Sequence, residues 1–324
     1  MHDPLQSFRL AIVASLGRAP ESIEPGRFQR FATSDRRGDS AGWCKLFHDL
    51  RAGVFGCYRL SLSETWCAVE RETMTRQQRA ELARQVQAAT LERQAQQRQQ
   101  WADNGKRIAR IWAECVPLVP GDPVTQYLKR RGLAGVWPLP AVLRYHRALP
   151  YWEGADKVGE FPAMVAPIVA PDGRTVALHR TYLARDGRKA EVPTVKKLTA
   201  AAGPMTGASI PLHKPLRGCM GIAEGIETAL AAWCGSGVPN VASYCAANLA
   251  AWRWPDGLQR LVIFADADKA GREAAETLSA RGLAAGLRVE VLTPSGDGED
   301  WCDVWASRSA VAKTEQYARA RGTA

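Results

Sequence analysis

The last third of this 324-residue chain is predicted to adopt an α/β fold with a parallel sheet and helices on both faces. Short apolar runs bounded by Gly or Pro alternate there with helix-forming stretches, in the order βαβαβαβ. Acidic residues directly follow two of the apolar runs, and a third acidic cluster comes near the end of the region. Because ligand sites of open α/β sheets lie outside the carboxyl ends of the strands, the three clusters are expected to meet in one crevice.

The elements of this region, residues 216–307, follow from the apolar runs and their Gly boundaries. Strands are expected at residues 220–223, 240–244, 261–265 and 288–292, and helices at 226–233, 246–252 and 270–281. After Asp303 the sequence predicts one more helix and then a frayed tail, so that residues 308–324 are a C-terminal helix and tail.

The acidic residues of the three clusters predict a cation site. Glu224 ends the first strand, Asp266 and Asp268 follow the third, and Asp300 and Asp303 make up the last cluster. Carboxylates crowded into one crevice repel each other unless a cation lies among them, and hard oxygen ligands suit Mg²⁺ or Mn²⁺. The alternative is a generic α/β domain in which acidic residues only favour the first turns of helices.

Three features together resemble the Toprim domain, which topoisomerases and bacterial-type primases share. They are Glu224-Gly225 after a strand, the group Asp266-x-Asp268-x-x-Gly271 after another, and the third acidic cluster. Glu-Gly alone carries no signal and Asp-x-Asp alone is weak, but both in this order, each closing an apolar run, are a strong signal.

The resemblance implies roles for the acidic residues. Asp266 and Asp268 would hold Mg²⁺, Glu224 would bind a metal ion or act as general base, and Asp300 or Asp303 would complete the set. Many bacterial-type primases have Asp four residues after the Glu, where this chain has Thr228. Glu227, one place earlier, either takes over that role or faces solvent on its helix.

Residues 116–215 are expected to form a basic α+β module. They carry a net charge of +7, whereas residues 216–324 carry −2 and the whole chain +10. A short helix is expected at 123–132 and a hairpin at 163–170 and 175–183 around the turn 171–173. The charge favours a polyanionic partner beside the metal site, and the alternative is an ordinary basic surface.

This basic module resembles the half of the primase core that precedes Toprim, where an Arg and a Lys reach phosphates of nucleotide or template. The matching positions are Arg180 and either Lys196 or Lys197. A guanidinium offers a fork for phosphate oxygens and an ammonium a point charge. The full set of candidates for nucleotide or DNA contacts is Arg180, Lys189, Lys196, Lys197, Lys269 and Arg272.

Residues 1–70 are expected to form a small β-rich module with two or three antiparallel strands. Cys44, His48, Cys57 and Cys67 raise the question of zinc, but they lack the close Cys pairs of structural zinc sites, so zinc is not expected. Bacterial-type primases carry a zinc ribbon here, so this is a departure. The aromatic side chains form the core of the module or stack on single-stranded bases; they are Trp43, Phe47, Phe55, Tyr58 and Trp66.

Residues 71–115 are expected to be a helical linker. Gln, Arg, Glu and Ala dominate up to Gln100, and a break is expected at Asn104-Gly105, before a second helix that ends at Cys115. A solvated spacer is favoured over an arm for nucleic acid.

The resemblance implies a DNA primase of phages, plasmids or integrated elements. Such an enzyme makes short RNA primers on single-stranded DNA from ribonucleoside triphosphates, and a separate replicative helicase is a candidate partner. A Toprim nuclease and a non-catalytic DNA-binding scaffold of the recombination-mediator type are the alternatives. No apolar run is long enough to span a membrane, and the eight scattered cysteines suit a reducing compartment, so a cytoplasmic protein is expected.

Overall fold

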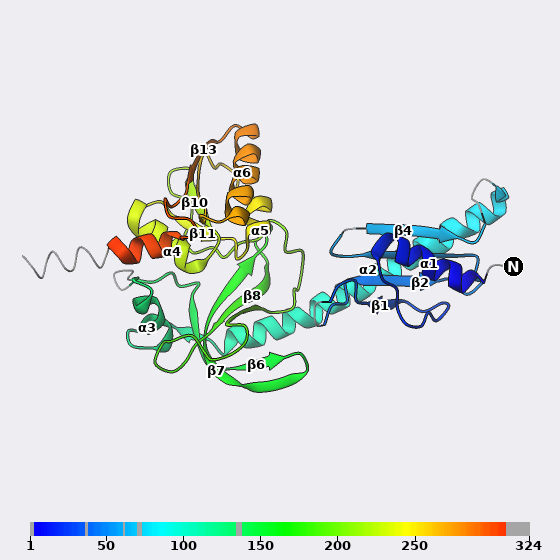
Figure 1. The fold of residues 1–324 in the computed structure, drawn as a ribbon, viewed down its shortest axis with the longest axis horizontal. Coiled ribbons are helices and arrows are strands. Elements are labelled where there is room, and N and C mark those ends of the chain that lie inside the picture. Colours follow the sequence, from blue (N-terminus) through cyan, green and yellow to red (C-terminus); the bar gives the residue numbers. More distant parts are fainter. Residues whose placement is uncertain (1–2, 36–37, 61, 70–72, 134–137, 309–324) are drawn as a thin grey trace, which may run out of the picture. The chain divides into compact units, whose positions relative to one another are not determined.

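The computed structural model of the protein describes residues 3–35, 38–60, 62–69, 73–133 and 138–308. The chain divides into two compact units, and Figure 1 shows the elements of each. One unit consists of residues 1–100 with 154–156, and the other of residues 101–153 and 157–324. No helix in the described ranges is both long and apolar enough to cross a lipid bilayer.

The first unit contains an antiparallel sheet, as the sequence predicted, but the sheet has four strands and not two or three. Its strands follow in the order β1 (Gln29–Phe31), β2 (Gly42–Leu46), β3 (Ala52–Cys57) and β4 (Leu62–Cys67). The sequence prediction missed the helix α1 (Pro4–Leu16), which Asp3 caps and Gly17 ends with a φ of 74°. Its buried residues Phe8, Ile12 and Leu16 recur at every fourth position, which is a helical signal.

Both faces of this sheet are covered. Cys44, Phe55 and Cys57 pack with α1 on one face, and Trp43 and Val54 pack with residue Ala89 of α2 (Arg76–Ala113) on the other. Trp43, Phe47 and Phe55 are each at most 5% exposed, so the core interpretation holds for these three rings. Tyr58 and Trp66 are half-buried.

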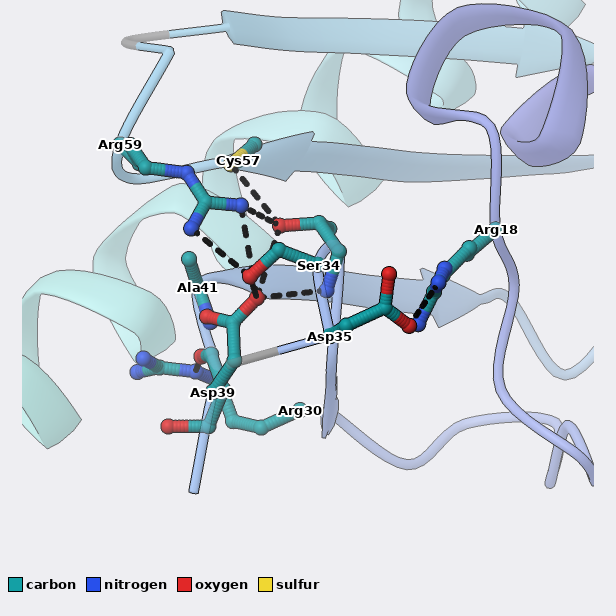
Figure 2. Close-up of polar contacts among 10 residues, drawn as sticks. Arg18, Arg30, Ser34, Asp35, Asp39, Ala41, Cys57 and Arg59 are labelled. Carbon is teal, nitrogen blue, oxygen red and sulfur yellow. Dashed lines mark hydrogen bonds and ion pairs between the residues drawn. The ribbon is translucent and has the colours of Figure 1, made fainter. Parts of the chain in front are cut away.

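One carboxylate fastens the loop after β1 to the end of β3. Asp39 accepts hydrogen bonds from the Thr33 backbone N–H at 2.9 Å, the Ser34 hydroxyl at 2.8 Å and the Arg59 guanidinium at 3.3 Å. Figure 2 shows the Asp39 carboxylate between Ser34 and Arg59. The hydroxyl of Ser34, the backbone N–H groups of Ala41 and Thr33, and Arg59 outweigh desolvation and hold the pKa of Asp39 well below its usual range. The loop therefore stays fastened at neutral pH.

The helix α2 is continuous over 38 residues, so the expected break at Asn104-Gly105 is wrong. The Asn104 amide donates to the Ala201 carbonyl at 2.8 Å, and Ile108, Ile111 and Trp112 pack into an apolar cluster of the second unit. This packing outweighs the roughly 1 kcal/mol that a glycine costs in a helix interior.

The second unit begins with a five-stranded sheet in the order β5 (Val116–Pro117), β6 (Arg144–Glu153), β7 (Asp156–Val169), β8 (Thr175–Tyr182) and β9 (Lys196–Leu198), with the helix α3 (Pro123–Arg130) beside it. The expected hairpin is present as the antiparallel pair β7–β8, in which Val165 lies opposite Arg180. The sequence prediction missed β6, whose mixed burial gives no clean alternation.

The α/β half follows the predicted order of elements. Its parallel sheet has the order β11 (Asn240–Ala242), β10 (Cys219–Ala223), β12 (Arg260–Phe264) and β13 (Arg288–Leu292). The helices between the strands are α4 (Ile226–Ser236), α5 (Ala246–Ala251) and α6 (Lys269–Ala284). Along β10 and β12, Ile222 and Ile263 pack toward α5 and α6, while Ala223 and Phe264 pack toward α4, so helices cover both faces as expected.

The two halves of the second unit share one core. The cluster that contains Ala229 and Leu230 of α4 also contains Val124 and Leu128 of α3 and Met164 of β7. Backbone hydrogen bonds in both directions between Ile210 and Ala242, at 2.8 and 3.1 Å, join the end of the first half to β11. The five-stranded sheet therefore packs against the α4 side of the parallel sheet.

A helix covers residues 301–308, so it begins before Asp303 and not after it as expected. It is attached to the end of α3, where the Trp305 indole donates to the Gly132 carbonyl at 3.2 Å and the Cys302 thiol to the Arg131 carbonyl at 3.4 Å. The remainder of the predicted C-terminal segment 308–324 lies outside the described residues. The domain bounds proposed from the sequence remain predictions.

We predict that metal chelation leaves the stability of the N-terminal unit unchanged. Cys44 and Cys57 are fully buried in an apolar cluster, and burial raises the pKa of the Cys44 thiol to about 12, which opposes the thiolate that zinc requires. The thermal unfolding of the full chain should be the same with and without a strong chelator. A lower midpoint after chelation, restored by Zn²⁺, would show a structural zinc site.

Candidate active site

Two of the predicted acidic residues leave the parallel sheet side by side. Glu224 follows β10 directly and Asp266 comes shortly after β12, and these strands are neighbours in which Ala223 lies opposite Phe264. Asp300 joins them because its loop is bound to the loop after β12: the Ala267 N–H donates to the Glu299 carbonyl at 2.9 Å. Glu224, Asp266 and Asp300 line one cleft of about 190 Å³.

Asp268 has a structural task beside the cleft. It is the N-cap of α6, and its carboxylate accepts a hydrogen bond from the Gly271 N–H at 2.7 Å. A Cβ on Gly271 would lie 2.7 Å from the Asp266 carbonyl oxygen, so only glycine lets the first turn of α6 pack on this backbone. The spacing Asp266-x-Asp268-x-x-Gly271 is therefore what places Asp266 at the start of the helix.

Asp266 has the chemistry of a cation ligand. Its Oδ1 is buried and has no hydrogen-bond partner among the described residues. Burial, followed by the charges of Glu224, Asp300 and Asp268, raises the pKa of Asp266 to about 7. Burial and the charge of Asp268 also raise the pKa of Glu224. A divalent cation would satisfy the unpartnered oxygen and relieve this repulsion, so the residues present fit Mg²⁺ or Mn²⁺.

The acidic residues do not form a complete cage. Among residues 3–308 as described, no group of three or more His, Cys, Asp or Glu side chains is arranged to hold a metal ion. Mg²⁺ commonly uses one or two carboxylates and takes its other ligands from water and substrate phosphates. The cleft therefore suits an ion that arrives with its substrate, and the metal roles of all five acidic residues remain predictions.

The last two acidic residues share an arginine that the sequence did not single out. The Arg131 guanidinium lies 3.6 Å from Asp300 and 3.6 Å from Asp303, and its Nε is buried without a hydrogen-bond partner among the described residues. Of the two carboxylates only Asp300 lines the cleft. Arg131 follows Lys129 and Arg130, and such a basic run is typical of a solvated helix end, so the sequence alone does not indicate a role at the site.

Glu227 does not face solvent, so that alternative is wrong. It is 3% exposed, and its two carboxylate oxygens accept hydrogen bonds from the Tyr127 hydroxyl at 2.6 Å and the Lys196 ammonium at 2.9 Å. Burial alone would raise the pKa of Glu227, but Lys196 and Tyr127 outweigh it and hold the pKa well below its usual range. The ionised Glu227 thus fixes Lys196 at the cleft.

A neutral imidazole lies in the same cleft. His179 of β8 is 6% exposed, and its Nδ1 has no hydrogen-bond partner within the described ranges. Burial lowers the pKa of His179 to about 4, so the ring is neutral at physiological pH. Lys189 also lines the cleft, which therefore has carboxylates on the α/β side and nitrogen groups on the side of the five-stranded sheet.

The other predicted basic residues are not brought to the carboxylates. Arg180 donates to the Tyr182 hydroxyl and the Leu198 carbonyl, and Lys197 lies 4.0 Å above the Tyr151 ring and donates to Glu153. Successive residues of a strand point to opposite faces, so Arg180 and Lys197 lie on the far side of the sheet from His179 and Lys196.

The two candidates of α6 also lie outside the cleft lining. Arg272 binds Asp297 and the Ala267 carbonyl, both at 2.6 Å, and the Lys269 side chain is 88% exposed and 3.8 Å from Glu273. Of the six predicted basic residues, Lys189 and Lys196 line the cleft.

Comparison with protein families agrees with this geometry. Residues 219–310 match the model of the Toprim domain, and residues 102–210 match a model described as Domain of unknown function (DUF7146). The α/β half is therefore a Toprim domain, which confirms the resemblance seen in the sequence. No curated protein matches the chain.

Solved structures with a similar fold include primase proteins. A DNA primase domain from Pseudomonas aeruginosa is 16% identical, with 48% of this chain covering 50% of that one and a TM-score of 0.32. The Escherichia coli primase catalytic core is 17% identical (60% and 72% covered, TM-score 0.38). The primase fragment of the bacteriophage T7 primase-helicase protein is 14% identical (88% and 99% covered, TM-score 0.34). The chain thus spans about half the length of the first of these structures.

We predict that Asp266→Asn stabilises the metal-free protein at pH 8. The folded pKa of Asp266, about 7, is above its value in the unfolded chain, so ionising this group costs stability as the pH rises through that range. The gain should be about 1–2 kcal/mol at pH 8, allowing for partial exposure, and near zero at pH 4. Urea unfolding at both pH values measures it.

Mg²⁺ provides the second arm of this test. It should raise the unfolding midpoint of the wild type at pH 8 and leave that of Asp266→Asn nearly unchanged. Equal stabilisation of both proteins would place the ion elsewhere.

We also predict that Lys196 and Glu227 are strongly coupled. Lys196→Met should destabilise the protein by about 2 kcal/mol because it leaves a buried carboxylate without its cation, and Glu227→Gln in the same chain should recover most of that loss. The contribution of Glu227 is present above about pH 4 and is lost as the pH falls through its lowered pKa. A double-mutant cycle in urea measures the coupling, and additive losses would contradict it.

Proposed function

We propose that this protein is a metal-dependent nucleotidyltransferase of the primase type, which joins ribonucleotides into short primers on single-stranded DNA. The observation that carries the proposal is the buried Oδ1 of Asp266, which has no hydrogen-bond partner among the described residues. It lies in a cleft of the Toprim domain that Glu224 and Asp300 line on one side and Lys196 on the other. Crowded carboxylates facing fixed cations suit a reaction centre at which a metal ion and a phosphate meet.

The metal ion would be held by Asp266 with one further carboxylate, Glu224 or Asp300, and when bound it would lower the pKa of the attacking 3′-hydroxyl and neutralise charge on the reacting phosphate. If Asp300 is that second ligand, Glu224, whose pKa is raised by burial and by Asp268, would accept the hydroxyl proton as general base. Asp268 supports this site from outside the cleft, through its charge and by capping α6.

The opposite wall supplies groups for the phosphates. Glu227 and Tyr127 fix the ammonium of Lys196, so little side-chain entropy is lost when it meets an anion. The neutral ring of His179 can donate one hydrogen bond without adding charge. Lys189 extends the positive wall toward solvent.

Nucleic acid as substrate is supported by the charge of the chain. Residues 116–215 carry +7 of the total +10, and this segment forms the wall of the cleft that faces the carboxylates. Replication of a phage, plasmid or integrated element in the cytoplasm, with a separate helicase as partner, completes the proposal and rests on the resemblance in domain order.

The test is incubation with single-stranded DNA, labelled ribonucleotides and Mg²⁺. New labelled oligomers are expected, and Asp266→Asn or Glu224→Gln should reduce synthesis at least about a hundredfold because each removes a carboxylate that would hold the metal ion or accept the hydroxyl proton. Single-stranded DNA binding by these variants should persist or improve. Asp297→Asn is the matched control, since Asp297 is exposed and pairs with Arg272 outside the cleft lining.

Other outcomes separate the alternatives. A shortened template without new oligomers would identify a nuclease. DNA binding without either product would identify a scaffold. Equal loss of binding and synthesis in the two acidic variants would contradict the metal role.

A further inference from the structure

A second groove lies next to the cleft and shares one residue with it. It has a volume of about 310 Å³, and Lys189 lines both spaces. Its floor is apolar, formed by Phe161, Pro162 and Leu183 among others, and Arg185 and Arg188 line it together with Lys189. Glu160 and Glu191 also line it, but Glu160 already forms an ion pair with Lys157 at 2.7 Å.

The turn that supplies these arginines has an internal counterpart elsewhere in the chain. Asp172-Gly173-Arg174 and Asp186-Gly187-Arg188 have the same local structure: the glycines have φ values of 83° and 77°, and each Arg pairs with the Asp two residues before it at 2.7 Å. Only the second turn lines the groove. It also carries an additional Arg185, where the first turn has Pro171.

The second turn packs tightly against helix α3, whereas no described residue packs against the glycine of the first turn. A Cβ on Gly187 would lie 2.5 Å from the Gln126 Cβ and 2.8 Å from the Tyr127 N, while one on Gly173 would meet nothing within 4 Å. The Arg130 guanidinium donates to the Asp186 carbonyl at 3.2 and 3.3 Å. One turn of α3 therefore contacts both sites: Arg130 holds the turn that lines the groove, and Tyr127 binds Glu227 in the cleft.

The arginines are available to a ligand. The Arg188 side chain is 70% exposed, and its pairing with Asp186 uses Nε, so its two terminal nitrogens point elsewhere. Arg185 is exposed and has no hydrogen bond or ion pair with any residue in the described ranges. Two guanidinium groups held on a fixed turn are well suited to the oxygens of a phosphodiester.

We propose that this groove holds one nucleotide of single-stranded DNA beside the catalytic cleft, with a phosphate on Arg185 and Arg188 and the sugar and base on the apolar floor. Its volume is at the small end of the range for ligand pockets, about 300–1,000 Å³, which suits a single nucleotide unit. Because Lys189 lines both spaces, its side chain lies where a strand bound in the cleft would pass into the groove. This inference rests on the proposed function, since it takes nucleic acid as the substrate.

The experiment measures binding of the full chain to a fluorescent oligothymidylate without catalysis. The variant Arg185→Ala/Arg188→Ala should bind about five- to tenfold more weakly at low salt. The slope of log K against log salt should fall by about 0.7, the contribution of the one single-strand phosphate that the two arginines hold together. The control Arg174→Ala, in the equivalent free turn, should match the wild type in both affinity and slope. Arg185→Glu alone, at an exposed side chain that makes no hydrogen bond or ion pair with the described residues, should fold normally and weaken binding further than Arg185→Ala.

A free nucleotide carries the same phosphate, sugar and base, so it is the other candidate ligand of the groove. Measuring the affinity of the protein for ATP with Mg²⁺ tests this alternative. ATP affinity should be unchanged in the double variant. Weaker ATP binding with unchanged DNA binding would assign the groove to the free nucleotide and overturn the proposal, and so would unchanged binding of both ligands. A wild-type protein that binds no single-stranded DNA would instead refute the proposed function itself.

Discussion

The carboxylates of the cleft repel one another, and the cationic side chains of the protein offset only part of this repulsion. Glu224, Asp266 and Asp300 lie in one cleft, and their mutual repulsion and burial raise the pKa of Asp266 to about 7. The protein opposes this repulsion with Lys196, held by the buried Glu227, and with Arg131 beside Asp300. These cations offset part of the repulsion, but Oδ1 of Asp266 has no hydrogen-bond partner within the described chain, so a bound ligand would satisfy it.

The backbone explains why the acidic side chains are where they are. Each follows a strand or a loop bound to the sheet, and the parallel arrangement brings the carboxyl ends together. Gly271 allows α6 to start directly on the Asp266 backbone, and Asp268 occupies the N–H of Gly271. The helix therefore does not present that N–H to a bound anion.

The sequence predicted the α/β half well because its signals are local. Apolar runs and glycine boundaries determine the order of elements, and the acidic residues after two of the strands determine the edge on which Glu224 and Asp266 lie. The contacts of Tyr127 and Arg131 could not be predicted in this way, since their partners lie 100 or more residues away and only the shared core brings them together. The helix α2 was divided wrongly because the cost of Gly105 is local and the packing that offsets it is not.

The choice between Lys196 and Lys197 shows where sequence reasoning reaches its limit. Both are basic, adjacent and close to the right position along the chain, but side chains of a strand alternate between its faces. The pairing of Thr181 with Lys196 and of Arg180 with Lys197 decides which of them reaches the carboxylates. A shift of one residue in this register would exchange their places, and nothing in the local sequence specifies the register.

The shared core has a consequence for how ligands come and go. Val124, Leu128 and Met164 from one wall of the cleft and Ala229 and Leu230 from the other are packed together, each almost completely shielded from water. Parting the walls like a hinge would expose this apolar area at about 25 cal/mol for every Å², so a clam-shell motion of the kind seen in many transferases is ruled out by its cost. Under the proposed function, a nucleic-acid strand would therefore enter and leave a cleft whose two walls stay together.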